Sequence, residues 1–481
     1  MKVVFASLFQ SGMGGGAGRV AHELAGAFAR EHQVVMVCPQ ARTGLVEGDR
    51  GYQIFGVKSA GDDEFHMPQL SGKAVRAIFD FLNEYRPDVI HAHDPALIGL
   101  ICQVWAGMNQ VPFVHTAHVL PSKALDFGTS DALNIKLLKS NFSESITQRV
   151  LEDFYSNCDA IIALNQSALE SIRDFGYQGR LYVIPNGRDL SKYNTCGFPS
   201  LEDEQKVITF VGYITNRKNQ FYLLRVLRHL PDQIKLRLIG KSLDEEYMHK
   251  LDEYQAEHDL QGVEFLGQVP HQDIPAHLAE SHLFPSASIM EVQSLVVLEA
   301  LASGTPVVGL SNETIDELVD DQVGKRLPAD ADPEAFAREI ERLLSLEDAA
   351  YQDMCQRARE RVSHLDWSNV VQKSARAYRE LLDIETELSR EGSDALAGLV
   401  SFFTTGEVEK FLLDRLSAYR RRWSRGGKVI DKLSLPERLW SWVRVPSSTW
   451  LISGFTILVS VFGYLFMKRK RKETAPDVRP N

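Results

Sequence analysis

Short apolar segments of strand length alternate with segments of helical spacing along most of this chain. One series starts at the N-terminus, and a second begins at Lys206. In order, the apolar segments are VVFASLF, VVMVC, DVIHAH, FVHTAH, AIIALN and YVIP, then ITFVGY, KLRLIG, VEFLG, HLFPS and PVVGL. Because this alternation is typical of a parallel sheet covered by helices, we predict an α/β protein with two doubly wound, Rossmann-like domains facing one cleft. Ligands in such folds bind at the carboxyl ends of the strands.

The length of 481 residues allows two domains of ordinary size and an appendage. We predict the two domains at residues 1–190 and 191–382, followed by a basic, partly amphipathic linker at 383–449. Residues 450–467, WLISGFTILVSVFGYLFM, are uncharged and mostly apolar, and a tail at 468–481 begins with KRKRK. This pattern predicts one transmembrane helix near the C-terminus, with a segment lying in the membrane interface as the alternative.

The net charge of −11 is unevenly distributed. Between Arg415 and Lys472 there are 14 Lys or Arg residues and two acidic ones, so the rest of the chain is strongly acidic. The acidic body argues against nucleic-acid binding, and the basic end favours an anionic membrane surface. We find no secretory signal ahead of the first strand, and the five cysteines are scattered, so we expect a catalytic body in the reducing cytoplasm.

Residues 286–310, SASIMEVQSLVVLEALASGTPVVGL, hold two carboxylates eight positions apart, Glu291 and Glu299. The pattern predicts a strand, a turn that contains Glu291, a helix over 293–303 that Gly304 ends, and another strand. Glu299 is then about two turns inside the helix. A rise of roughly 1.5 Å per residue separates the two carboxylates by about 12 Å along the helix axis.

This spacing leaves room for a diphosphate between the two carboxylates. Backbone N–H groups at the helix start, near Ser294 and Leu295, would face the diphosphate with the positive end of the helix dipole. Glu291 and Glu299 would then accept hydrogen bonds from hydroxyl groups, one set on a sugar and the other on a ribose. The segment is therefore predicted to bind a nucleotide sugar.

The Glu-x7-Glu pattern followed by ALASGTPVV closely resembles the donor-binding motif of the family-four retaining glycosyltransferases, which have the GT-B fold. Other segments resemble the family in the same order along residues 1 to about 382. They are SGMGGGAGRVAHELAGAFAREHQVVMV, PDVIHAHDP, VPFVHTAHV, VIPNGRDLSKY, VITFVGYITNRKN and VEFLGQVPHQDIPAHLAES. The resemblance implies a hexosyltransferase that uses a nucleotide sugar and retains the configuration of the transferred sugar.

The resemblance also implies roles for single residues. His118 matches a family histidine near the donor sugar and the acceptor, so we expect it to orient the sugar while Glu291 holds the sugar hydroxyls. These two are the predicted catalytic residues. Lys218 matches the lysine that contacts the donor phosphates.

Five glycines lie in the seven residues from Gly12 to Gly18. Only Gly16, Gly18 and Ala21 fit a Gly-x-Gly-x-x-Gly/Ala pattern, and the next strand ends without an acidic residue, so a nicotinamide or flavin site is disfavoured. A tight turn accounts for one or two glycines, and close approach of the backbone to a ligand accounts for the rest. In the family this loop reaches the donor diphosphate and the acceptor, which makes Gly15 and Gly16 predicted donor-binding residues.

Four histidines end two apolar strands, as His91-x-His93 and His115-x-x-His118. A zinc site is disfavoured, because Asp94 is the one nearby carboxylate that could complete it. We expect His91, His93 and His115 to be structural. No metal and no cofactor other than the nucleotide-sugar substrate are predicted.

Arg217 and Lys218 follow the strand ITFVGY. A solvated loop is one reading, but a fixed cation there would stabilise the charge that a leaving diphosphate gains. The family usually has Gly-Arg where this chain has Gly212-Tyr213, so either Arg217 supplies the missing cation or the site is weaker. Val292-Gln293-Ser294 replaces the commoner small-Phe-Gly, and its Gln resembles family members that glycosylate diacylglycerol.

We therefore predict a membrane-anchored glycosyltransferase that moves a hexose from a nucleotide sugar to a membrane lipid. Diacylglycerol is the leading acceptor, and a polyprenyl-linked saccharide is its rival. Metal independence is expected because no Asp-x-Asp motif lies in the donor region. A nucleotide-sugar epimerase and a catalytically silent membrane scaffold are the other hypotheses. The presence of His118, Lys218, Glu291 and Glu299 together argues against the scaffold.

Overall fold

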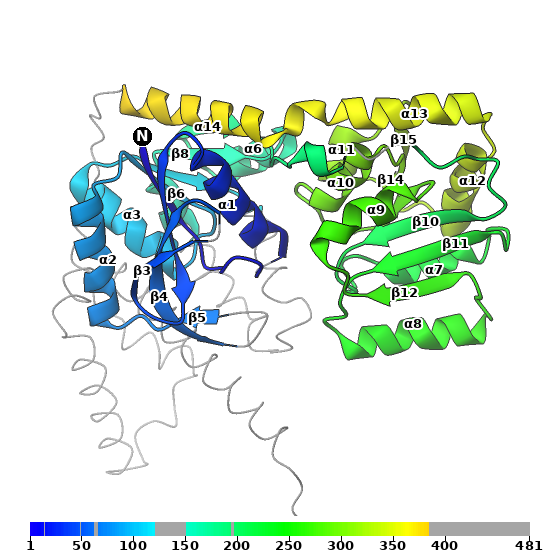
Figure 1. Ribbon diagram of the computed structural model, residues 1–481, viewed down its shortest axis with the longest axis horizontal. Coiled ribbons are helices and arrows are strands. Elements are labelled where there is room, and N and C mark those ends of the chain that lie inside the picture. The colour runs from blue at the N-terminus through cyan, green and yellow to red at the C-terminus, as the bar shows by residue number, and fades with distance from the viewer. Residues whose placement is uncertain (14, 49, 62–65, 121–150, 194–196, 384–481) are drawn as a thin grey trace, which may run out of the picture. The chain divides into compact units, whose positions relative to one another are not determined.

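The computed structural model describes all residues except 14, 49, 62–65, 121–150, 194–196 and 384–481 (Figure 1). The described residues form two compact units. The first consists of residues 1–115, 151–160 and 381–383, and the second of 116–120 and 161–380. Within the described ranges no helix is long and apolar enough to cross a membrane, and the span predicted at 450–467 lies outside them.

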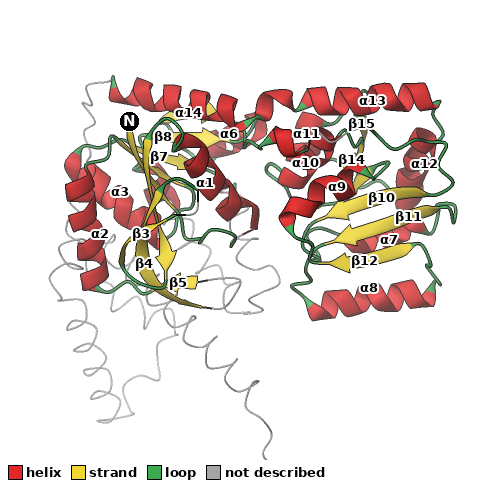
Figure 2. Ribbon diagram, viewed as in Figure 1, coloured by secondary structure: helices red, strands yellow, loops and turns green. Residues whose placement is uncertain are grey.

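One sheet of nine strands contains every described strand before residue 184 (Figure 2). Helices α1, α2, α3 and α6 lie between its strands in the sequence. The elements are β1 (Lys2–Ala6), α1 (Gly15–Phe28), β2 (Gln33–Gln40), β3 (Gly44–Glu47), β4 (Gln53–Gly61), β5 (His66–Pro68), α2 (Gly72–Tyr85), β6 (Val89–Ala92), α3 (Leu97–Asn109), β7 (Phe113–Thr116), β8 (Ala160–Ala163), α6 (Gln166–Asp174) and β9 (Arg180–Val183). The strand order is β3-β4-β2-β1-β6-β7-β8-β9, with β5 paired to β4.

The centre of this sheet is parallel, as predicted, but one edge is not. β1 pairs in parallel with β2 and β6, and β6 with β7. β3 and β5 run antiparallel to β4, and all three were missed in the sequence. Only residues 48–52 join β3 to β4, which is too short for the crossover that parallel strands need.

The second unit continues with alternating strands and helices. They are η3 (Leu190–Lys192), β10 (Lys206–Val211), α7 (Gln220–Leu227), β11 (Ile234–Ile239), α8 (Glu245–Glu257), β12 (Val263–Gly267), η4 (His271–Asp273), α9 (Ile274–Ala279), β13 (Phe284–Ser286), α10 (Leu295–Ser303), β14 (Val307–Leu310), α11 (Glu313–Leu318), β15 (Gly324–Leu327), α12 (Pro333–Leu344), α13 (Asp348–Arg361), η5 (Ser363–Leu365) and α14 (Trp367–Leu382).

Two parallel three-stranded sheets, β10-β11-β12 and β13-β14-β15, are joined into one layer. A parallel bridge links Ile208 of β10 to Leu283, and the Thr209 N–H donates to the Leu283 carbonyl at 3.0 Å. The predicted strands ITFVGY, KLRLIG, VEFLG, HLFPS and PVVGL are all present. Strand β15 was missed because its sequence, GKRL, has charged residues in the middle.

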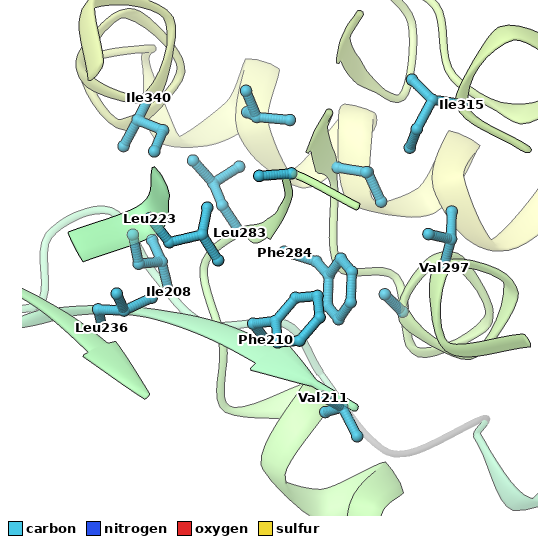
Figure 3. Close-up of a cluster of buried hydrophobic side chains, with 14 of the residues drawn as sticks. Ile208, Phe210, Val211, Leu223, Leu236, Leu283, Phe284, Val297, Ile315 and Ile340 are labelled. Atoms are coloured by element: carbon cyan, nitrogen blue, oxygen red, sulfur yellow. The ribbon is translucent and has the colours of Figure 1, made fainter. Parts of the chain in front are cut away.

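The core of the second unit lies between this sheet and its helices (Figure 3). Phe210 of β10 and Phe284 of β13 are fully buried, with ring centroids 5.7 Å apart, and Figure 3 shows both in the same cluster as Val297 of α10. Such a close-packed core holds β10, β13 and α10 in fixed register. The loops that follow β10 and β13 are therefore placed on a rigid base at the carboxyl edge of the sheet.

Candidate active site

Helix α10 begins later than the sequence suggested. It covers Leu295–Ser303 and not 293–303, so Glu299 is its fifth residue and lies little more than one turn inside. Because residues 291–294 are not helical, the estimate of about 12 Å between the carboxylates does not hold. The end is as predicted: Gly304 has φ +80°, and its N–H donates to carbonyls of the last turn.

Glu291 is held by two cations from the loop after β10. The Lys218 ammonium forms an ion pair with Glu291 Oε1, and Arg217 Nη1 lies 3.7 Å from the same oxygen. Lys218 and Glu291 side chains are each 10% exposed, and Arg217 is 29% exposed. The two loops are also tied by their backbones, since the Ile289 N–H donates to the Arg217 carbonyl at 2.9 Å. Glu291, Arg217 and Lys218 were all singled out in the sequence, and they do meet. The sequence analysis had assigned Glu291 to the sugar and the two cations to the diphosphate.

Two hydrogen bonds from other segments hold the turn between Glu291 and α10. Asn165 Nδ2 donates to the Val292 carbonyl at 2.7 Å, and the Asn186 N–H donates to Gln293 Oε1 at 2.6 Å. Gln293 therefore has a structural reason to replace the more usual residue: its amide anchors the segment at Asn186. This turn fixes the direction in which Glu291 leaves the backbone.

The start of α10 was predicted to offer N–H groups to a diphosphate. The Ser294 N–H donates at 2.8 Å to Thr314 Oγ1, and the Ser294 side chain makes no capping hydrogen bond to the helix. Leu295 is the first helical residue. The first turn of a helix carries N–H groups without intrahelical partners and a partial positive charge. Together with Lys218 and Arg217, it makes this edge suited to an anion.

Glu299 lies in a second ion pair that sequence reasoning missed. Arg188 Nε is 2.8 Å from Glu299 Oε1, and the two side chains are 2% and 1% exposed. His271 Nε2 lies 3.3 Å from the same oxygen, and its side chain is 39% exposed. Arg188 stands in the segment VIPNGRDLSKY and His271 in VPHQD, both of which were assigned to the family pattern, but pairing over 111 and 28 positions leaves no local signal.

Arg188 is also fixed through its backbone. Its N–H donates to the Leu365 carbonyl at 2.9 Å, and its carbonyl accepts from the Trp367 N–H at 3.2 Å. Arg188 therefore joins α10 to the segment that leads into α14. Because the Arg188 backbone is held by these two hydrogen bonds, its guanidinium can fix the position of the Glu299 carboxylate.

His118 lies just past β7. Burial lowers the pKa of its imidazole to about 4, so it is neutral at neutral pH. A neutral imidazole can donate one hydrogen bond and accept another, which suits a group that orients sugar hydroxyls. His118 belongs to the second unit, together with Arg217, Lys218, Glu291, Ser294, Leu295 and Glu299.

The other three histidines of the two strand ends are packed side chains. The rings of His91 and His93 stack with centroids 4.4 Å apart, and His115 Nδ1 lies 3.1 Å from the Ala92 carbonyl oxygen. Among the described residues no group of three or more His, Cys, Asp or Glu is placed to hold a metal ion. The contacts of these three histidines agree with the structural role expected for them.

Gly15 and Gly16 belong to the first unit, where they open helix α1. This helix starts four residues before the position predicted for it, at Arg19. Gly15 has φ +59°, and a Cβ at Gly18 would lie 2.1 Å from the Met13 carbonyl oxygen. Close packing therefore requires Gly18, and backbone conformation favours Gly15. Gly15 and Gly16 remain predicted donor contacts.

Two protein families match this chain. The family described as Glycosyltransferase Family 4 matches residues 14–192, and the one described as Glycosyl transferases group 1 matches residues 198–361. An alpha-monoglucosyldiacylglycerol synthase of Streptococcus pneumoniae is 22% identical over 286 residues, which cover 56% of this chain and 63% of that protein. A phosphatidyl-myo-inositol mannosyltransferase of Mycobacterium leprae is 27% identical over 306 residues, 60% of this chain and 73% of that protein.

Solved structures share the fold. A sucrose-phosphate synthase from Thermosynechococcus elongatus superposes with a TM-score of 0.64 at 20% identity, covering 79% of this chain and 98% of that one. HepE of Anabaena, solved with UDP-glucose, gives a TM-score of 0.60 at 20% identity and covers 79% of this chain and all of the other.

Proposed function

The chain belongs to the family-four glycosyltransferases with the GT-B fold, and on this premise we propose that it moves a hexose from a nucleotide sugar to a membrane lipid. The observation that carries the donor part is the ion pair between Lys218 and Glu291 beside the start of α10. It places a cation, a carboxylate and a helix N-terminus at one edge of a rigid sheet. A diphosphate and a sugar need those three features.

The chemistry follows from an exchange of partners. When the donor binds, Lys218 turns from Glu291 to the diphosphate, and Glu291 becomes available to accept hydrogen bonds from sugar hydroxyls. As the bond between sugar and diphosphate breaks, the leaving group gains charge, and Lys218 with Arg217 and the α10 N-terminus stabilises it. His118, neutral because burial lowers its pKa, orients the sugar. The reaction proceeds with retention and without a metal ion in this proposal.

The lipid acceptor rests on two separate supports. The names of two similar proteins, an alpha-monoglucosyldiacylglycerol synthase and a phosphatidyl-myo-inositol mannosyltransferase, contain a lipid. In this chain, the apolar stretch 450–467 and the flanking basic residues have the composition of a membrane-bound segment. In this proposal the protein is attached to the membrane near its C-terminus. The catalytic body lies on the cytoplasmic side, where nucleotide sugars are made.

Turnover by the full chain in lipid vesicles tests this function. A panel of nucleotide sugars is supplied, and released nucleoside diphosphate is measured with diacylglycerol, with extracted membrane lipids, with a soluble sugar acceptor and with no acceptor. We expect release that depends on lipid and is lost in Lys218→Ala. Release with the soluble acceptor alone would overturn the lipid acceptor, free epimerised sugar without acceptor would indicate an epimerase, and binding without release would indicate a scaffold.

A further inference from the structure

We infer that Asn165 is a positioning residue of the reaction: its side chain holds the turn of residues 291–294, which begins with Glu291, in place relative to the strand end before His118. The inference rests on the proposed function, in which Glu291 and His118 hold the transferred sugar. Asn165 itself would contact neither the donor nor the acceptor, and it would act through the placement of these two residues.

Strand β8 links the backbone of His118 to Asn165. The N–H of Ala117, the residue before His118, donates to the carbonyl of Ile162 in β8 at 3.0 Å. Two residues beyond the end of β8, Asn165 caps the N-terminus of α6. All of these residues belong to the second unit. Because hydrogen bonds between adjacent strands fix their register, Asn165 has a defined position relative to the His118 backbone.

The amide of Asn165 is used at both ends. Its Oδ1 accepts from the Ala168 N–H at 2.8 Å, and its Nδ2 donates to the Val292 carbonyl at 2.7 Å. A backbone N–H can only donate and a backbone carbonyl can only accept, so the orientation of the amide is determined. Asn165 and Val292 are 2% and 5% exposed, so water has little access to this bond. The bond therefore holds the residue that directly follows Glu291.

The adjacent strand end supports the same turn. The Ile184 N–H donates to the carbonyl of the last residue of β8 at 3.0 Å. Two positions later, the Asn186 N–H donates to Gln293 Oε1 at 2.6 Å. Val292 and Gln293 are thus held from two neighbouring strand ends. Asn165 makes its bond to the turn with a side chain and Asn186 with its backbone, so a substitution of Asn165 removes one tie and leaves the other.

Glu291 needs this support when the donor is bound. Without the donor, its carboxylate is paired with Lys218. In the proposed function Lys218 turns to the diphosphate, and the turn then directs the carboxylate toward the sugar. A displacement of about 1 Å in such a group can lower the rate by roughly 100-fold. A turn anchored to the strand beside His118 keeps the two sugar contacts at a constant spacing.

The variant Asn165→Ser tests this role. Serine is a favoured N-cap, so α6 keeps its cap, but the shorter side chain does not reach the Val292 carbonyl. The full chain in lipid vesicles is titrated calorimetrically with UDP and with UDP-glucose, and GDP and GDP-mannose replace them if GDP binds more tightly. We expect UDP affinity within about twofold of the wild type, UDP-glucose affinity about tenfold lower, and kcat lower by about 100-fold.

A double-mutant cycle with Glu291→Ala separates positioning from general loosening. If Asn165 acts through Glu291, then Asn165→Ser should change the UDP-glucose affinity of Glu291→Ala by less than about twofold. Loss of packing alone would weaken UDP and UDP-glucose alike, and its effect would add in full to that of Glu291→Ala. This second pattern would overturn the positioning role.

Two further variants control the experiment. Asn165→Asp keeps the cap but places a carboxylate oxygen against the Val292 carbonyl, so it should be at least as impaired with UDP-glucose as Asn165→Ser. Asp332→Ser makes a similar change of cap at α12, where Asp332 Oδ1 accepts from the Ala335 N–H at 2.6 Å, and it should behave as the wild type. Equal losses in Asp332→Ser and Asn165→Ser would assign the effect to the cap and not to the Val292 bond.

The two levels of the proposal fail differently. If the wild type binds and turns over the nucleotide sugar and Asn165→Ser does both equally well, the positioning role is wrong and the transferase stands. If the wild type binds neither UDP nor GDP, the proposed function falls, and the positioning role falls with it.

Discussion

Ionisable groups at the carboxyl ends of strands follow different patterns in two regions of this molecule. After β6 and β7, burial raises the pKa of Asp94 to about 6 and lowers that of His118 to about 4, so both shifts favour the neutral form. After β10 and at α10, the buried groups are paired as opposite charges: Lys218 with Glu291, and Arg188 with Glu299.

The difference shows two ways to compensate for the loss of hydration. A group of the first kind is stabilised by hydrogen bonds, as Asp94 is by the Leu8 N–H, which donates to its Oδ2 at 2.6 Å. A paired group keeps its charge and needs a partner at all times, but it can exchange that partner for a charged ligand. In the proposed function, the paired region would therefore bind the diphosphate, and His118 would contact hydroxyl groups.

The strongest test of the paired region is Arg188→Leu. It leaves the Glu299 carboxylate buried without its guanidinium, so the free energy of unfolding should fall by about 3–5 kcal/mol. Replacing both residues, Arg188→Leu with Glu299→Leu, should restore most of the loss, since no buried charge remains. Urea unfolding followed by tryptophan fluorescence measures both. Arg338→Leu, which breaks an exposed pair with Glu334, is the matched control and should change stability by less than about 1 kcal/mol.

Equal stability losses in the Arg188 and Arg338 variants would show that the buried pair is no more costly to break than a surface one. The distinction between the paired and the neutral region would then lose its energetic basis. A double variant as unstable as Arg188→Leu would point to lost packing and not to the unpaired carboxylate.

Lys218→Ala should separate catalysis from stability in the paired region. Because the lysine would face the leaving diphosphate, kcat/KM is expected to fall by about 100- to 1000-fold. The free energy of unfolding should change much less than in Arg188→Leu, as Glu291 keeps Arg217 nearby and retains some solvent. Lys325→Ala, which removes the partner of Asp321 on the surface, is the control for turnover. Retained activity in Lys218→Ala would remove the cation from the mechanism.

The sequence revealed the strands of the two parallel series and the Glu-x7-Glu segment because both have local signals, whereas β3, β4, β5 and β15 were missed. Apolar runs mark β10 to β14, and Gly304 marks the end of α10. The pairing of Arg188 with Glu299 was not predictable, since nothing near either residue identifies a partner 111 positions away. The start of α10 was placed too early for a related reason. The helical spacing of the apolar residues was traced back to Gln293, but Gln293 lies in a turn, where its Oε1 accepts from the Asn186 N–H.

The neutral region can be tested through the pH dependence of stability. His118 binds protons more weakly in the folded state, so its contribution is complete above about pH 6.5 and is lost as the pH falls through about 4. Asp94 binds its proton more strongly when folded, so its contribution is complete below about pH 3.8 and is lost as the pH rises through about 6. The two contributions oppose each other between about pH 4 and pH 6.

Single variants should therefore uncover opposite slopes. In Asp94→Asn the His118 slope remains, and stability should fall by about 2 kcal/mol on acidification across this window. In His118→Gln the Asp94 slope remains, and stability should rise by a similar amount. Urea midpoints at several pH values, with the wild type as reference, measure both. Parallel slopes in the two variants would mean that these groups are not held neutral by burial.

The smallest expected effect concerns Arg217, which lies at the solvent side of the paired region. Its Nη1 is 3.7 Å from Glu291 and the side chain is 29% exposed, so it is more hydrated than Lys218. Arg217→Ala should lower kcat/KM by about tenfold, and the loss should shrink at high salt because exposed charges are screened. Arg217→Lys should recover most of the activity if the residue acts only as a positive charge. A loss as large as that of Lys218→Ala, unchanged by salt, would place Arg217 in direct contact with the diphosphate. Arg217 would then take the place of the family arginine that Tyr213 replaces, and Arg217 and Lys218 would be equivalent cations.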